Sequence, residues 1–185
     1  MLAAAGPVVD EASLPSSPGM KSAEKLQLPT CSRPLLSPTL KVQLARVKQF
    51  AARQKTGPGR SLMQDDLFAA RVARAEVDIL ALEFTENRIK SELGAGKTPG
   101  ALSSMTKILG TEMQQRVTEL AVDALGPQAL IWQPKAIEPG STVPAVGPEY
   151  AMTAMARYLN TRATSIYGGS NEVQRGIIAK MVLGL

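Results

Sequence analysis

The chain has 185 residues, enough for one domain with a hydrophobic core, and a formal net charge of +5. It contains no histidine, which excludes histidine-based triads, histidine general bases and mixed Cys/His zinc sites, and its lone Cys31 cannot form an internal disulfide. Aromatic residues are few, so the core must consist mainly of Leu, Val, Ile, Met and Ala, a composition that favours packed helices.

The positive charge lies in the first third of the chain. Residues 1–60 hold 9 Lys/Arg and 3 Asp/Glu, a balance of +6, whereas residues 61–185 hold 12 and 13, a balance of −1. Such a basic segment could attract nucleic acid, but it lacks interleaved aromatic residues that stack on bases, so we expect no nucleic-acid binding. No apolar run reaches the roughly 18 residues of a membrane span, and the lone cysteine suits a cytoplasmic protein.

Residues 1–38 are rich in proline and serine and contain no aromatic residue. Such a segment buries too little apolar surface to offset its ordering entropy, which predicts a disordered tail. Residues 39–185 are then the folded domain. A truncated or rearranged gene, or a wrongly assigned start, would explain the tail; a docking segment for a partner is the alternative.

The first predicted helix starts at about Leu40 and ends before the Gly/Pro-rich residues 55–60. Its expected core face is Leu40, Leu44, Val47 and Ala51. Ser61 and Gln64 have the spacing of a capping box, which predicts a second helix over 61–93. Its expected apolar stripe is Met63, Leu67, Ala70, Val77, Leu80 and Phe84.

After a turn at 94–100, a helix over 102–125 is expected to form an antiparallel hairpin with its predecessor. Its predicted core face is Met105, Leu109, Met113, Val117, Leu120 and Ala124. Residues 126–147 form a loop that Trp132 is expected to anchor to the bundle, with an exposed tryptophan at an interface as the alternative. Lys107 and Arg162 are expected to form ion pairs at helix surfaces.

Two more helices follow, on either side of Gly168 and Gly169. Their expected core residues are Met152, Met155, Ala156, Leu159 and Ala163, then Val173, Ile177 and Met181. The fold class is therefore predicted to be all-α, an up-and-down helical bundle. The glycine pair allows backbone angles closed to other residues, and Ser170 or Asn171 can cap the last helix, whose N-terminus favours an anion.

The C-terminal motif resembles the end of acyl-CoA dehydrogenases, most closely the bacterial large-subunit or pimeloyl-CoA dehydrogenase-like members. The matching residues are Tyr158–Arg162, Ser165–Arg175, Ile177–Lys180 and Val182–Leu185. The likeness is nearly continuous over this stretch and looser back to about Leu40. It implies the C-terminal helical domain of an enzyme that uses FAD to oxidise the α,β-bond of an acyl-CoA thioester, within a homo- or hetero-oligomer, a dimer or tetramer.

The resemblance also implies roles for individual residues. Gly169, Ser170 and Glu172 match positions that meet the adenosine diphosphate portion of FAD, although Ser170 can also be a plain N-cap. Arg53 resembles an arginine that reaches a neighbour's FAD, with an ordinary solvated arginine as the alternative. Gly126 occupies the place of a loop that lies against another subunit's FAD.

For the acyl-CoA substrate, the resemblance implies that Tyr167 and Gly168 border the thioester pocket. Gly168 stands where many family members have a catalytic glutamate, and glycine cannot remove a proton. Other members place the base on the first helix of this domain, but residues 40–60 contain no Asp or Glu. We therefore assign no catalytic residue and no metal ligand.

The predicted function is the C-terminal domain of an acyl-CoA dehydrogenase, truncated and inactive alone. The alternatives are a subunit of a hetero-oligomeric dehydrogenase, with the base supplied by its partner, and a non-catalytic helical assembly module. The acyl chain length cannot be read from the sequence.

Overall fold

The computed structural model describes residues 36–184 and confirms the all-α fold class. Its helices are α1 (Leu36–Arg53), α2 (Asp66–Gly94), α3 (Ala101–Leu125), α4 (Pro134–Ile137), α5 (Ala151–Thr161) and α6 (Asn171–Leu183). Three 3-10 turns are η2 (Leu62–Gln64), η3 (Gly126–Leu130) and η4 (Arg162–Ser165). Residues 1–35 of the expected tail lie outside the described residues.

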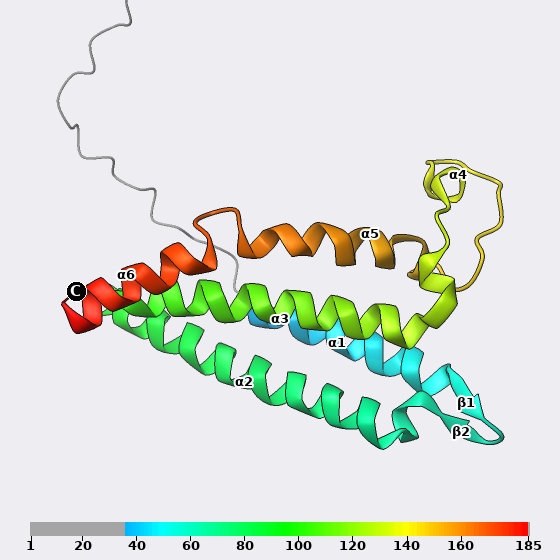
Figure 1. Cartoon of the computed structure of the whole chain (residues 1–185), viewed down its shortest axis with the longest axis horizontal. Helices are drawn as coiled ribbons and strands as arrows, with labels where there is room; N and C mark the ends of the chain where they lie inside the picture. The colour runs from blue at the N-terminus through cyan, green and yellow to red at the C-terminus, as the bar shows by residue number, and fades with distance from the viewer. Residues whose placement is uncertain (1–35, 185) are drawn as a thin grey trace, which may run out of the picture. The chain divides into compact units, whose positions relative to one another are not determined.

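The helix α3 is the centre of the bundle (Figure 1). It contacts α1 and α2 on one side and α5 and α6 on the other, and these last two follow one another along its length. No helix in the described range 36–184 is long and apolar enough to cross a membrane.

The connection between α1 and α2 is a small antiparallel hairpin of β1 (Lys55–Gly57) and β2 (Arg60–Ser61), where the sequence predicted only the end of the first helix. The Ser61 amide donates to the Gln64 side chain at 2.8 Å, as expected for a capping box, but this contact opens only η2. The long helix begins at Asp66, because the Asp65 carboxylate accepts from the Phe68 amide at 2.9 Å.

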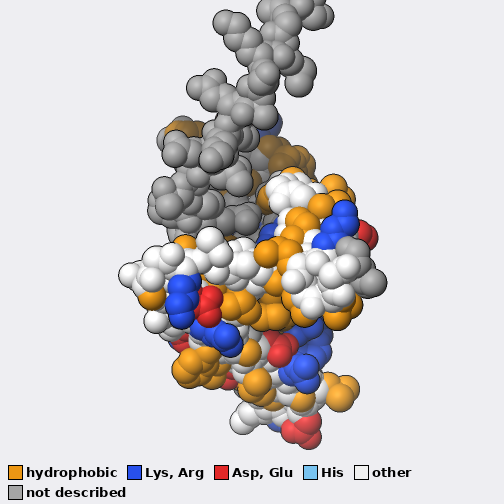
Figure 2. Space-filling view, turned by 90° about the vertical axis from the view of Figure 1, so that its left-hand side faces the viewer, with side chains coloured by type: hydrophobic (Ala, Val, Ile, Leu, Met, Phe, Trp, Pro, Cys, Tyr) orange, Lys and Arg blue, Asp and Glu red, His pale blue; other side chains and the backbone are white. Residues whose placement is uncertain are grey.

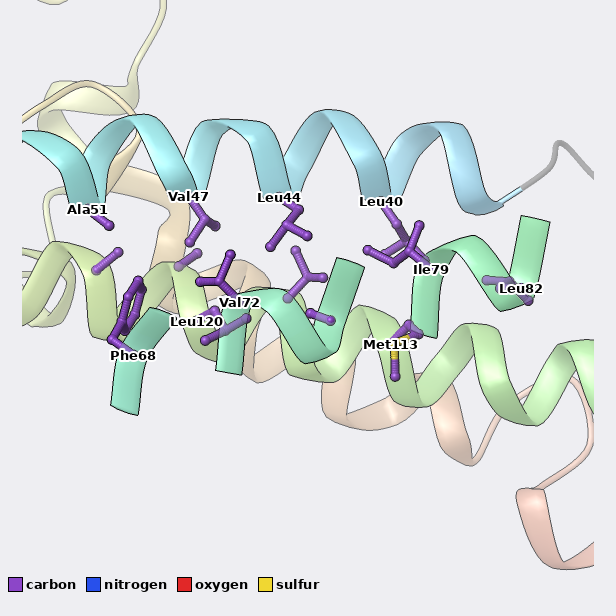
Figure 3. Close-up of a cluster of buried hydrophobic side chains, with 14 residues drawn as sticks. Leu40, Leu44, Val47, Ala51, Phe68, Val72, Ile79, Leu82, Met113 and Leu120 are labelled. Carbon is purple, nitrogen blue, oxygen red and sulfur yellow. The ribbon is translucent and has the colours of Figure 1, made fainter. Parts of the chain in front are cut away.

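The predicted core face of α1 is confirmed. Its four members are between 0% and 3% exposed and point toward α2 and α3 (Figure 3): Leu40, Leu44, Val47 and Ala51. On α3, the predicted face is confirmed from Leu109 onward: Leu109 packs partly buried against the core, and Met113, Val117, Leu120 and Ala124 are all buried. Met105, at the start of that helix, is exposed.

The predicted core stripe of the second helix is wrong except for Met63, which lies in η2 and packs partly buried against the core. Leu67 and Phe84 are 79% and 74% exposed, and Val77 and Leu80 also face outward. The residues that enter the core instead are Phe68, Val72, Ala75, Ile79 and Leu82. Both sets have helical spacing, so α2 has two apolar faces, and periodicity alone could not decide which one the bundle buries.

The predicted core faces of the last two helices are also wrong. On α5, Ala151 and Ala154 are buried, whereas Leu159 is 60% exposed. The small alanine side chains lie where α5 packs against α3, whereas Met152 and Met155 are only half-buried. On α6, Val173, Ile177 and Met181 are exposed, and Asn171 is the buried residue.

The loop between α3 and α5 is held by a polar side chain and not by its tryptophan. Trp132 is 72% exposed, so the predicted anchoring role is wrong. The neighbouring Gln133 is buried, and its amide donates to the Val146 carbonyl at 3.0 Å and accepts from the Val146 amide at 2.7 Å. This pair of hydrogen bonds closes the loop.

The N-terminus of α1 is fixed by a carboxylate from α2. Glu86 is buried and accepts from the Leu36 amide at 2.9 Å, the Ser37 amide at 3.3 Å and the Ser37 hydroxyl at 2.6 Å. These donors include amides that have no partner within the helix. Leu36 also approaches α3 closely, since a Cβ on Gly110 would lie 2.5 Å from its Cδ1. Glu86 therefore determines where α1 begins.

Replacing Glu86 by alanine should lower the free energy of unfolding by about 2 kcal/mol, because buried amide donors lose their acceptor. Urea denaturation followed by circular dichroism measures this. The control is Glu92→Ala, which breaks an exposed pair with Arg88 on the same helix and should cost less than about 0.5 kcal/mol. Equal losses in the two variants would contradict the capping role of Glu86.

Candidate functional site

The candidate site is the corner between η4 and α6, formed by Tyr167, Gly168, Gly169, Ser170 and Glu172. Gly168 and Gly169 have φ angles of 67° and 87°, a conformation that side chains rarely adopt. A Cβ on Gly169 would also lie 2.6 Å from the Gln174 side-chain nitrogen. The positive φ angles thus account for the glycine pair predicted from the sequence, and neither glycine adds a side chain to the corner.

The last helix begins as predicted. Ser170 is its N-cap, and its hydroxyl accepts from the Val173 amide at 3.3 Å. The following Asn171 is buried and accepts from Lys107 Nζ at 2.9 Å and from the Thr111 hydroxyl at 3.4 Å. Lys107 is only 6% exposed, so it does not lie at a helix surface as predicted. These contacts fix the start of α6 on α3.

A second set of polar contacts holds η4 on α3. The Gln115 amide donates to the Thr161 and Arg162 carbonyls at 3.2 Å and 3.3 Å. The Arg162 guanidinium donates to the Gln115 carbonyl at 2.9 Å and lies over the Tyr158 ring, 4.4 Å from its centroid. Arg162 thus serves as a backbone clamp, in place of the surface ion pair expected from the sequence.

The carboxylate of the corner belongs to Glu172, whose side chain is 79% exposed. The pKa of Glu172 is lowered from its ordinary value near 4.5 by a hydrogen bond from its own backbone amide, and further by the Ser170 hydroxyl and by the charges of Arg175 and Lys107. The carboxylate is therefore ionised at neutral pH and reaches solvent beside the helix N-terminus. It is an acceptor for hydroxyl or amino donors.

Tyr167 and Gly168 form the outer edge of the corner. The Tyr167 amide donates to the Ala163 carbonyl at 3.1 Å, while its side chain is 54% exposed. Gly168, between Tyr167 and Gly169, offers no side chain to accept a proton. Within residues 36–184, no group of three or more Cys, Asp or Glu side chains is arranged to hold a metal ion.

The two remaining candidates, Arg53 and Gly126, lie away from this corner. Leu36, at the start of α1, lies beside Gly110 of α3. Phe50, near the end of α1, packs against the cluster that contains Leu125 at the end of α3. Thus α1 and α3 run in the same direction, and Arg53 and Gly126 are at the same end of the bundle. The corner is attached to α3 at Lys107 and Thr111, so at 1.5 Å per residue about 25 Å of helix separates it from Gly126.

The structure therefore groups the predicted cofactor residues into two sets, one at the corner and one at the opposite end of α3. The residues that hold the corner in place, Lys107, Asn171 and Gln115, were not predicted. Their signal in the sequence is a run of polar residues at helical spacing on α3, beside its apolar stripe: Ser104, Lys107, Thr111, Gln115 and Thr118. Such a polar run also fits a solvated face, which is why it was missed.

Comparison with known proteins gives a consistent picture. The family model described as "Acyl-CoA dehydrogenase, C-terminal domain" matches residues 42–183. A curated relative, the acyl-CoA dehydrogenase IpdE1 of Mycobacterium tuberculosis, is 31% identical over 148 residues, which are 80% of this chain and 34% of that protein. The chain thus spans about a third of the length of this relative.

Two solved structures show the same fold. The ChsE4–ChsE5 complex from Mycobacterium tuberculosis aligns with a TM-score of 0.62 and 25% identity, over 80% of this chain and 35% of that one. The acyl-CoA dehydrogenase from Geobacillus kaustophilus aligns with a TM-score of 0.62 and 25% identity, over 81% of this chain and 34% of that one.

The depressed pKa of Glu172 predicts a pH-dependent stability difference from Glu172→Gln. Because the folded state favours the ionised carboxylate, wild type gains stability above the unfolded pKa near 4.5 and loses it as the pH falls through the lower folded value. Melting temperatures at pH 7 should therefore be higher for wild type, and the difference should shrink as the pH is lowered below about 4.5. Glu138→Gln, in an exposed loop, is the control for the loss of a surface carboxylate as such. A wild-type advantage over Glu172→Gln that persists at low pH would contradict the assignment.

Proposed function

The chain belongs to the acyl-CoA dehydrogenase family through its C-terminal helical domain, and from that premise we propose that it forms one wall of an FAD- and acyl-CoA-binding site in an oligomeric dehydrogenase. The reaction is the α,β-dehydrogenation of an acyl-CoA thioester. When bound, FAD supplies the acceptor for the hydride that leaves the β-carbon. The domain supplies binding surface and orientation, and the proposed location is cytoplasmic.

The observation that carries the proposal is the chemistry of the glycine corner. Its bare backbone at Gly168 and Gly169 leaves room for a flat ligand to approach, and the N-terminus of α6 lies directly behind it. The ionised Glu172 would repel a phosphate but suits the hydroxyl and amino donors of adenosine. We therefore assign Gly169, Ser170 and Glu172 to the adenosine part of FAD, and Tyr167 and Gly168 to the acyl thioester.

The second set of residues supports an oligomer. About 25 Å of α3 separates the corner from the end that carries Arg53 and Gly126. The two sets of residues therefore need not contact the same flavin. In the proposal, Arg53 and Gly126 face the FAD of a neighbouring subunit. A solved relative in fold, ChsE4–ChsE5, is itself described as a complex.

The base that removes the α-proton is proposed to come from another polypeptide or domain. At the corner, the position that faces the thioester is Gly168, and the described part of α1, residues 36–53, contains no Asp or Glu. Glu172 follows the turn and is assigned to adenosine, so it is not available for this role.

A second candidate function, a non-catalytic assembly module, is favoured by one observation: the large apolar side chains on the outer face of α2. A module of this kind would keep the helical surfaces for association and would bind no flavin. The absorbance spectrum of the purified protein distinguishes the two functions. An oligomer without a flavin absorbance band would support the assembly module.

Titration of FAD into the full chain, followed by quenching of flavin fluorescence, tests the proposal. Glu172→Ala should weaken FAD binding about tenfold, because it removes a charged hydrogen-bond acceptor. Glu138→Ala, which removes an exposed loop carboxylate, is the matched control and should leave the affinity unchanged. Equal affinities for the two variants, or no FAD binding by any of the three proteins, would contradict the proposed site.

The same preparation, loaded with FAD, should not reduce an electron acceptor when acyl-CoA thioesters are added, because Gly168 cannot remove the α-proton. Dye reduction measured spectrophotometrically tests this. Acyl-CoA-dependent turnover by the pure chain would show that a base is present in it and would contradict this part of the proposal.

A further inference from the structure

Arg175 lies between two carboxylates near the start of α6. Its Nη2 donates to Glu112 Oε1 of α3 at 3.2 Å. Glu172 Oε1, on the same helix as Arg175, lies 3.9 Å from its Nη1, which is too far for a hydrogen bond. Among the described residues, these two carboxylates form the ion pairs of Arg175, and the one on α3 binds it more closely.

The geometry of α6 also brings Arg175 within reach of Glu172. Residues three apart on a helix are neighbours, and helical side chains tilt toward the N-terminus. Arg175 therefore extends back toward the glycine corner, and a rotation of its side chain, with no change in the backbone, would pair it directly with Glu172. The side chains are 58% and 79% exposed, so neither is fixed by packing.

Charged side chains of both signs are mixed on the end of the molecule at which α6 finishes. Figure 2 views this end and shows Lys and Arg side chains beside Asp and Glu side chains, so neither sign forms a single large patch. Two cations act on Glu172, namely Arg175 and Lys107. Lys107 is buried and donates to Asn171 at 2.9 Å, so Arg175 is the cation that is exposed enough to change its partner.

We propose that Glu112 is a positioning residue, which holds Arg175 on α3 and so keeps the Glu172 carboxylate open to the donors of a ligand. The inference rests on the proposed function, in which Glu172 accepts hydrogen bonds from adenosine. The donors that Glu172 already has are its own backbone amide and the Ser170 hydroxyl. A carboxylate has about four acceptor positions, so further donors can bind it. A bidentate arginine would occupy the remaining positions and compete with the ligand.

A purely structural role for the pair of Glu112 and Arg175 is the alternative. The pair joins α3 to α6, but Asn171 already fixes the start of α6 through Lys107 and Thr111. Glu112 and Arg175 are also 41% and 58% exposed, and exposed ion pairs contribute little to stability. In a structural pair, the loss of either partner has the same effect. In the proposed arrangement, only the loss of Glu112 releases Arg175 onto Glu172.

The first test is a double-mutant cycle on the affinity of the full chain for FAD, measured by flavin fluorescence at pH 7. Glu112→Ala should weaken binding about threefold, the size of effect expected from one exposed ion pair. Arg175→Met should leave the affinity unchanged, and the double variant Glu112→Ala/Arg175→Met should bind as wild type does. The control is Glu76→Ala, which breaks a pair of similar exposure with Lys48, between α1 and α2, and should have no effect.

The second test needs no flavin. Titration of the Glu172 side-chain carboxyl by NMR should give a lower pKa in Glu112→Ala than in wild type, because Arg175 moves closer to it. Removing the negative charge of Glu112 by itself also lowers this pKa. The two causes are separated in the Arg175→Met background, where Glu112→Ala should lower the pKa of Glu172 much less.

The proposal is overturned by equal weakening of FAD binding in Glu112→Ala and Arg175→Met, or by a double variant that does not recover. It is also overturned if Glu112→Ala lowers the pKa of Glu172 equally in both backgrounds. A wild type that binds no FAD would contradict the proposed function, and the carboxyl titration would still decide whether Glu112 controls Arg175. Circular dichroism confirms that the variants are folded.

Discussion

The hydrogen bonds between α3 and the start of α6 are the interaction on which the candidate site depends. Lys107 and Thr111 both donate to the Asn171 side chain, and this residue is the first of the helix that follows the glycine corner. Because Asn171 and Lys107 are buried, the contact is shielded from water. The corner lies at the surface, but the first residue of the helix that follows it is held inside the bundle.

The central helix can perform this role because its sides differ in chemistry. Toward α1 and α2 it presents Met113, Val117 and Leu120, which join the main hydrophobic core (Figure 3). Toward η4 and α6 it presents polar side chains, which bind particular backbone and side-chain atoms. Apolar packing holds the helices together but has little directional preference. The hydrogen bonds from Gln115 to the Thr161 and Arg162 carbonyls are directional, so they fix the position of η4 along α3.

The sequence predicted the core face of a helix correctly only where the helix has a single apolar face. α1 has one apolar face, and its core residues were predicted correctly. α2 has two, and the prediction chose the outer one, because hydrophobicity does not record which face meets another helix. α5 buries two alanines and leaves Leu159 outside, since close helix packing selects small side chains. The glycine corner was predictable because positive φ angles and an N-cap follow from local chemistry, whereas the distance between Arg53 and the corner depends on α1 running parallel to α3.

In the proposed oligomer, three exposed surfaces of the described residues would meet a ligand or another subunit. The outer face of α2, the corner at Gly168 and Gly169, and the end that carries Arg53 and Gly126 lie on different sides of the same bundle. In the proposed oligomer, neighbouring copies would cover these surfaces, because each copy of a closed assembly both presents and receives surface. In the proposed function, the corner and the Arg53 end carry the directional, polar groups that ligand binding requires, whereas the outer face of α2 is apolar.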